Sequence, residues 1–149
     1  MILDAEAQPL GRVASFAAKK ALLGEEVVII NAEKAIIVGK KDEIIARHLK
    51  KLTARNKGNY RKGPFHFKKP DRFLRKTIRG MLPYKSYRGR EAYRRVMAYI
   101  GFPKEEIKRR HNLDLSKEKP VKVIKDENYA ERFCITLGEL CSTLGGKWQ

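Results

Sequence analysis

Cysteine and histidine are scarce in this sequence of 149 residues, which contains two cysteines and three histidines. Cys134 and Cys141 are seven positions apart in a segment whose pattern predicts a helix, where a rise of about 1.5 Å per residue separates them by about 10 Å. That separation is too long for a disulfide. A structural zinc site needs about four such ligands at short spacing, and His48, His66 and His111 are scattered, so no metal site is expected.

Long apolar runs are also missing. No stretch approaches the about 18–20 apolar residues that cross a bilayer, and the amino end carries Asp4 and Glu6 in place of a basic and then apolar signal pattern. These features predict a cytoplasmic chain with no membrane partner. With 42% hydrophobic residues, the chain is long enough for a single domain, 1–149, with a buried core.

Negative charge is scarce in one third of the chain. From Arg47 to Arg95 there are 18 Lys and Arg residues but only two acidic ones, Asp71 and Glu91. The remaining residues hold 16 basic and 15 acidic groups, so nearly all of the formal net charge of +17 lies in this basic segment (residues 47–95). Like charges at this density repel one another and add nothing to a core, which indicates a polyanionic partner, most often nucleic acid.

The amino-terminal half has the pattern of an α/β unit. A short apolar start is followed by apolar residues at helical spacing from Leu10 to Leu22. Val27–Ile30 and Ala35–Val38 are continuous apolar runs, which are typical of parallel strands covered on both faces. Asp42 is the expected cap of a second helix, whose inward residues are expected to be Ile44, Ile45, His48, Leu49 and Leu52. This order predicts a layered α/β fold with a largely parallel sheet.

The basic segment begins on the outer face of this second helix and continues into a loop. Glycines and prolines interrupt residues 56–70, which are expected to be irregular. Rings at Tyr60, Phe65, His66 and Phe67 alternate there with cations. Cations bind phosphates, and rings stack on unpaired bases at about 1–3 kcal/mol per base. Phe65 and Phe67 either stack in this way or pack into the domain.

A third helix is expected after Pro70, with Asp71 as its cap and its end at Gly80–Pro83. The cations of this helix recur at i, i+3, i+4 and i+7 and therefore share one face: Arg72, Arg75, Lys76 and Arg79. The apolar residues share another face: Leu74, Ile78 and Met81. Neighbouring like charges cost a helix a few tenths of a kcal/mol per pair. A solvated face usually carries interspersed Glu, which is missing from residues 72–90, so we expect this face to contact the polyanion.

After this helix the chain repeats the mixture of rings and cations. A loop is expected at Pro83–Gly89 and a short helix at Arg90–Arg95, and Val96–Ile100 is either a strand or the end of that helix. The residues predicted to bind RNA are Arg47, Lys50, Lys51, Arg55, Lys57, Tyr60, Arg61, Lys62, Lys68, Lys69, Arg72, Arg75, Lys76, Arg79, Lys85, Arg88, Arg90 and Arg94.

Four stretches occur in a specific order and spacing: Leu3–Glu6 with Leu10–Ser15, Val28–Lys34, Arg79–Pro83, and Gly89–Arg90 with Tyr99–Gly101. Together they resemble the universal large-subunit ribosomal protein family "L thirteen", over roughly residues 2–103. The loop at residues 60–70 stands where the bacterial branch has a His- and Gly-rich stretch, so the chain resembles the archaeal and eukaryotic branch. The lack of a long basic carboxyl-terminal extension favours the archaeal side.

The resemblance implies a three-layer α/β/α fold around a four-stranded, mainly parallel sheet, with a core at about residues 2–103 and an extension at about 104–149. It implies a structural role in the large ribosomal subunit, with large-subunit ribosomal RNA and neighbouring ribosomal proteins as partners and with no enzymatic activity, cofactor or small-molecule substrate. It also implies that Val96–Ile100 is a strand and that the turn Arg79–Pro83 contacts RNA.

The residues after Pro103 predict a surface helix, an extended segment at Pro120–Ile124 and a terminal helix. Thr136 and Glu139 have the spacing of a capping box before that terminal helix, which is expected to close at Gly145–Gly146. Trp148 is expected to anchor the tail on this domain or on a neighbouring ribosomal protein.

Two other classes of protein fit a basic segment. An RNA-modifying enzyme or processing factor outside the ribosome would also need one, but an enzyme needs a reactive site as well, and residues 4–11 lack a Gly-x-Gly-x-x-Gly turn. Carboxylates that could hold a catalytic metal are nearly absent from the basic segment. A DNA-binding module is the second alternative, but the chain lacks helix-turn-helix spacing, and loops rich in rings favour irregular RNA.

Overall fold

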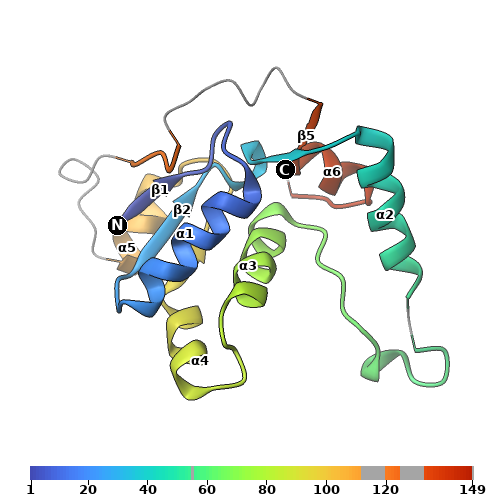
Figure 1. Ribbon diagram of the computed structural model, residues 1–149, viewed down its shortest axis with the longest axis horizontal. Helices are drawn as coiled ribbons and strands as arrows, with labels where there is room; N and C mark the ends of the chain where they lie inside the picture. Colours follow the sequence, from blue (N-terminus) through green and yellow to red (C-terminus); the bar gives the residue numbers. More distant parts are fainter. Residues whose placement is uncertain (55, 112–119, 125–132, 149) are drawn as a thin grey trace.

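The main sheet is short and parallel (Figure 1). The structure, a computed structural model, describes residues 1–54, 56–111, 120–124 and 133–148. Strands β1 (Ile2–Asp4), β2 (Val27–Ile30) and β4 (Val96–Ala98) lie in the order β1-β2-β4. All four residues of β2 are buried because a strand flanks it on each side and helices cover both faces. The predicted central strand is therefore confirmed, as is the strand that follows Arg95.

The prediction of a four-stranded sheet is wrong. The strand β3 (Ile36–Val38) leaves the main sheet and pairs antiparallel with β5 (Cys134–Thr136) in a separate two-stranded sheet. Burial decreases along β3 until Val38 is 48% exposed, so this apolar run is not covered on both faces. Within the described part of the chain, the main sheet continues beyond β1 as a bridge at Val121. The Val121 N–H donates to Ile2 O and its carbonyl accepts from Asp4 N–H, both at 3.0 Å.

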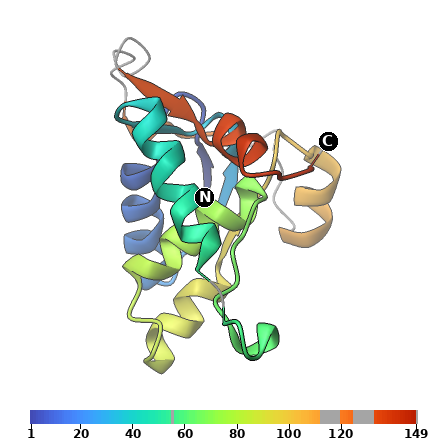
Figure 2. The same cartoon turned by 90° about the vertical axis from the view of Figure 1, so that its right-hand side faces the viewer.

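Successive residues of a strand point to opposite faces of the sheet, so the apolar strands present side chains on both faces. Helices cover each of these faces. Leu3, Ile29 and Val96 face the layer formed by α1 (Leu10–Leu22), α3 (Pro70–Met81) and α4 (Tyr87–Arg94). Val28 and Tyr99 instead pack with Ile107 of α5 (Lys104–His111). Figure 2 shows α1 and α5 on opposite sides of the strands. The three-layer arrangement expected from the sequence is therefore present around a smaller sheet.

The helix α1 has a buried stripe made largely of alanine. Ala14, Ala17 and Ala21 are fully buried, and their small side chains allow α1 to lie close to α3. The turn after α1 requires Gly24, which has φ +99°. A short 3-10 turn, η1 (Ala32–Lys34), follows β2 and leads into β3.

The helix α2 (Lys41–Thr53) packs on a second, smaller core rather than on the main sheet. Ile44 lies there with Ile135, Leu140 and Leu144, next to the two-stranded sheet and α6 (Leu137–Thr143). The predictions of an Asp42 cap and an inward Leu49 are wrong. The helix begins two residues earlier than this cap implies, so that Lys40 is the cap and Asp42 lies in the first turn. Leu49 is 44% exposed because only one edge of α2 contacts the small core.

The carboxyl-terminal helix begins as its spacing predicts. The Thr136 hydroxyl accepts a hydrogen bond from Glu139 N–H at 3.2 Å, while the Glu139 carboxylate forms an ion pair with Lys41. The chain turns at Gly145, with φ +77°, and Trp148 packs against the main core. The predicted anchoring of the tail on this domain is confirmed.

The two cysteines are free. The prediction that both lie in one helical segment is wrong, because Cys134 belongs to β5 and Cys141 to α6. Burial raises the pKa of Cys141 to about 12, so this residue remains a protonated thiol near neutral pH. Among the described residues, no helix is both long and apolar enough to span a bilayer.

Gln8 connects residues 120–124 to the main domain. Gln8 is buried, with 3% exposure. Its side-chain amide donates from Nε2 to Ile124 O at 3.0 Å and accepts at Oε1 from Ile124 N–H at 2.9 Å. We expect Gln8→Leu to reduce the free energy of unfolding by about 1–3 kcal/mol, because it leaves two backbone groups without partners. Urea unfolding measures the loss, and amide exchange at Ile124 is expected to increase. Unchanged exchange at Ile124 would show that the amide does not hold this segment.

Candidate nucleic-acid interface

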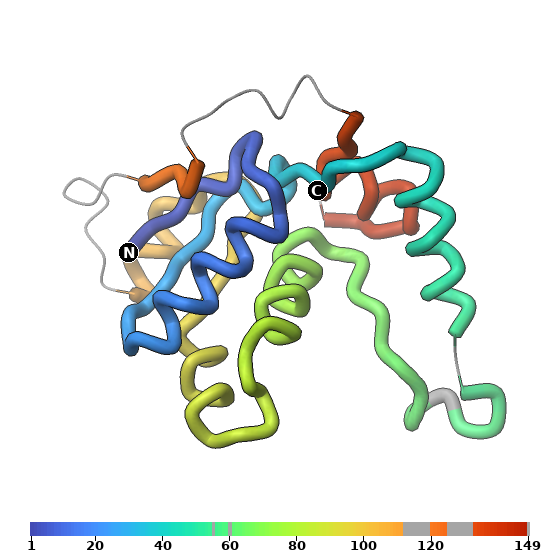
Figure 3. The backbone as a smooth tube through the Cα atoms, in the orientation of Figure 1, coloured from blue at the N-terminus to red at the C-terminus, as the bar shows by residue number. Residues whose placement is uncertain are grey.

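The predicted cations lie on three neighbouring parts of the molecule: α2, the segment that follows it, and the α3–α4 hairpin. Figure 3 shows the segment after α2 extending away from the sheet before the chain returns to α3. The exposed cations on this basic face are Arg47, Lys50, Lys51, Lys57, Arg61, Lys62, Lys68, Lys69, Arg72, Lys76, Arg79, Lys85, Arg88, Arg90 and Arg94. Arg55 and the side chain of Tyr60 lie outside the part that the structure describes.

The helix α3 separates its charged and apolar faces. Leu74 and Ile78 are fully buried in the main core, while Arg72 and Arg79 are exposed and Arg75 is half-buried. The predicted stripe is therefore present, but the predicted cap is wrong. Pro70 occupies the first turn after an extended Lys69, so Asp71 is not the cap. Met81 lies at the end of the helix, where it is 44% exposed.

Aromatic rings hold two arginines of α3. The guanidinium carbon of Arg75 lies 4.9 Å from the centre of the Tyr93 ring, and that of Arg79 lies 5.2 Å from the centre of the Tyr84 ring. The two tyrosines meet edge to face at 5.5 Å. A ring stabilises an arginine through its face and leaves the N–H groups at the guanidinium edge available for phosphate. Tyr93 was not among the residues expected at the interface, because its partner on α3 is 18 positions away and no local pattern indicates the contact.

The turn between α3 and α4 is tighter than predicted. The helix α4 begins at Tyr87 rather than Arg90, because the Ser86 hydroxyl caps it by accepting from Gly89 N–H at 3.2 Å. Gly89 is buried against the turn, where an added Cβ would lie 2.1 Å from Pro83 O. This close approach fixes the helix that presents Arg88 and Arg90 to solvent.

Acidic partners for cations are present on the rest of the surface but scarce on the basic face. Away from this face, Lys20 pairs with Glu25 at 2.8 Å and Arg110 pairs with Glu106 at 3.1 Å. Lys34 donates a hydrogen bond to Glu6 at 2.6 Å, which raises the pKa of Lys34. On the basic face, Arg94 pairs with Glu91 at 2.7 Å. The two acidic residues of the basic segment are too few to neutralise its 18 cations.

The segment between α2 and α3 is irregular, apart from a 3-10 turn, η2 (Tyr60–Lys62). Its two phenylalanines differ in exposure. Phe65 is 67% exposed, and its ring is accessible for stacking on a base. Phe67 is half-buried, with the Lys76 ammonium 5.7 Å from its ring centre. The described residues contain no group of three or more His, Cys, Asp or Glu that could hold a metal ion.

Comparison with known proteins agrees with this arrangement. The family described as "Ribosomal protein L13" matches residues 1–105. The chain is 43% identical over 148 residues to "Large ribosomal subunit protein uL13" of Methanopyrus kandleri, covering 97% of this chain and 86% of the relative. It is 42% identical over 151 residues to the protein of that name from Methanocaldococcus jannaschii, covering 99% and 98%. Since one match spans more than half of the chain and the others nearly all of it, the chain belongs to the ribosomal protein L13 family.

Proposed function

We propose that this protein is a structural component of the large ribosomal subunit and binds large-subunit ribosomal RNA through its basic face. The observation that carries the proposal is the cationic face of α3, where two of the three arginines lie on tyrosine rings. Arginine forks bind phosphate oxygens in pairs, which gives geometric specificity as well as attraction. Membership of the family, whose relatives carry the name of a large-subunit protein, supports the same role.

In this proposal the basic face has two kinds of contact with RNA. The cations of α2, α3 and α4 bind phosphates and set the position of the protein on the RNA. The exposed ring of Phe65 stacks on an unpaired base, as proteins commonly do in irregular RNA. The location that follows is the cytoplasmic ribosome, with neighbouring ribosomal proteins as further partners.

We also propose that the extension at about residues 104–149 folds together with the core at about 2–103, as one domain. The pairing of β3 with β5, the bridge at Val121 and the hydrogen bonds of Gln8 support this proposal, because each joins a residue of the extension to the core.

Cosedimentation tests the proposed role in the ribosome. We expect the purified protein to sediment with large subunits that lack it at low salt and to be released at high salt, because counterions compete for the phosphates. Small subunits at equal concentration are the control, and binding to them is expected to be weaker. Equal binding to both subunits, or binding that resists high salt, would contradict the proposal.

A further inference from the structure

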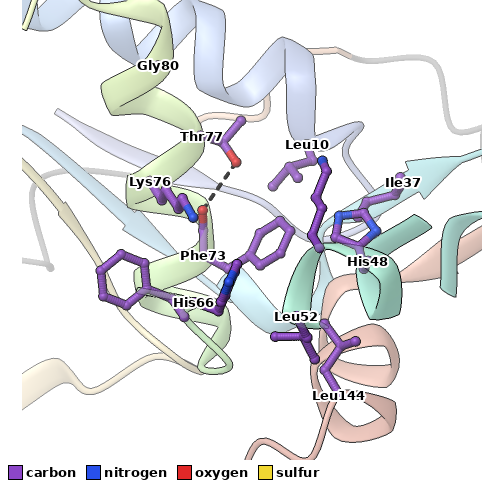
Figure 4. A pocket seen from close by; sticks show the side chains of 12 residues that line it. Leu10, Ile37, His48, Leu52, His66, Phe73, Lys76, Thr77, Gly80 and Leu144 are labelled. Atoms are coloured by element: carbon purple, nitrogen blue, oxygen red, sulfur yellow. Dashed lines mark hydrogen bonds between the residues drawn. The ribbon is translucent and has the colours of Figure 1, made fainter. Parts of the chain in front are cut away.

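A pocket of about 390 Å³ lies between α2 and α3, at the inner edge of the basic face (Figure 4). Its floor is apolar and includes Leu52 of α2 and Leu144, while the ring of Phe73 forms part of the α3 side. The His48 ring lies next to Phe73, with 5.5 Å between ring centres. The volume is within the range of about 300–1,000 Å³ that is typical of sites for small organic groups.

The rim of this pocket is cationic. Lys51 and Lys76 line it, and the described lining residues include no Asp or Glu. Lys76 belongs both to the stripe of α3 and to the pocket, since its ammonium lies near the Phe67 ring and 3.5 Å from Phe65 O. A polyanion on the stripe would therefore pass directly over the opening. An apolar, ring-lined cavity below a row of cations matches a nucleotide, which has a flat aromatic base and a charged phosphate.

Two histidines add polar groups to this cavity. The Nδ1 atom of His48 lies 2.8 Å from Ile44 O, and the Nε2 atom of His66 lies 3.0 Å from Ala54 O. Because a carbonyl oxygen only accepts, these partners assign the proton of each neutral ring to the bonded nitrogen. The second nitrogen of each ring has no hydrogen-bond partner among the described residues and can accept one. Such acceptors suit the amino and imino groups at the edge of a base.

We infer that this pocket binds a single unpaired base of the RNA, turned out of its strand, while Lys51 and Lys76 hold the adjoining phosphates. The inference rests on the proposed function and specifies which surface reads a base rather than the backbone. A protein side chain is a poorer occupant, because nothing in a neutral or basic peptide would compensate the cationic rim.

Short single-stranded RNA tests this inference with the full chain. Its affinity is compared with that of an oligomer of equal length whose central nucleotide is abasic, so both carry the same phosphates. We expect the central base to strengthen binding by about 5- to 150-fold, the range given by stacking on aromatic side chains. Failure of both oligomers to bind at low salt would contradict the proposed function itself, and binding of both with equal affinity would contradict only the base site.

Two variants locate the effect. Gly80 lines the pocket, and a Cβ there meets no atom within 4 Å, so Gly80→Met fills the cavity without a backbone clash. Phe73→Leu keeps an apolar side chain but removes the ring. Both are expected to bring the ratio of the two affinities close to one. The matched control is Gly11→Met, at an exposed helical glycine with equal space, which is expected to keep the ratio of the unchanged protein. A ratio that stays high in both pocket variants would overturn the inference.

Discussion

Replacement of Arg72, Arg75, Lys76 and Arg79 by Gln is expected to weaken RNA binding strongly and to make it less dependent on salt. Each phosphate contact contributes about 0.7–0.9 to the slope of log K against log salt, so the loss of four cations is expected to reduce the slope by about two or more. If the plots of log K against log salt for the unchanged protein and the variant meet near 1 M salt, this difference in slope corresponds to about 100-fold weaker binding by the variant at 0.1 M. Titration of large-subunit ribosomal RNA at several salt concentrations measures it.

The matched control changes the same number of cations on the opposite side of the sheet. Lys104, Lys108, Arg109 and Arg110 are exposed on α5, and their replacement by Gln removes the same total charge. If the cations act only by long-range attraction, the two variants are expected to lose the same affinity and the same salt dependence. If the α3 cations contact RNA directly, the α5 variant is expected to change much less in both. Equal slopes in the two variants would remove α3 from the interface.

Gly89→Ala is expected to reduce the free energy of unfolding by about 3 kcal/mol or more. The new Cβ would lie 2.1 Å from Pro83 O and 2.9 Å from Tyr84 N, and these are backbone atoms that cannot turn away. Overpacking of this kind costs about 1–3 kcal/mol, and displacement of the Ser86 cap adds about 0.5–2 kcal/mol. For a chain of 149 residues, a loss of about 3 kcal/mol lowers the Tm by roughly 6–12 °C, which calorimetry measures.

Gly80→Ala is the comparison for this variant. It makes the same chemical change in a helix, but its Cβ meets no atom within 4 Å. A helical glycine costs about 0.5–1 kcal/mol relative to alanine, so this variant is expected to be slightly more stable than the unchanged protein. Equal effects of the two substitutions would show that the turn at Gly89 is not tight.

Local apolar pattern predicts the main layers of this fold well. The apolar run Val27–Ile30 and the alanine stripe of α1 are both expected to be buried, and both are buried in the structure. The run Ala35–Val38 is also continuously apolar, but it does not become a central strand of the main sheet. Its pairing partner, Cys134–Thr136, is about 100 positions away, and nothing in the run itself indicates whether a parallel or an antiparallel neighbour will pair with it. Pairing at such a distance depends on tertiary packing, which local pattern does not contain.

The charges of the candidate interface could also be predicted, because cations at helical spacing share a face whatever the rest of the chain does. The groups that position them could not. Tyr93 reaches Arg75 only because the chain reverses direction after α3, and that reversal depends on the cap at Ser86 and the close approach at Gly89. The pocket beside Phe73 is likewise built from separate segments of the chain, so no local pattern indicates it.

Acylation of lysines in the free and RNA-bound protein tests the central claim most directly. We expect large-subunit ribosomal RNA to protect the lysines of the basic face, namely Lys50, Lys51, Lys57, Lys62, Lys68, Lys69, Lys76 and Lys85. Lys104 and Lys108, on α5, are expected to react equally in both states. Protection of α5 without protection of Lys76, or equal reactivity of every lysine with and without RNA, would contradict the account.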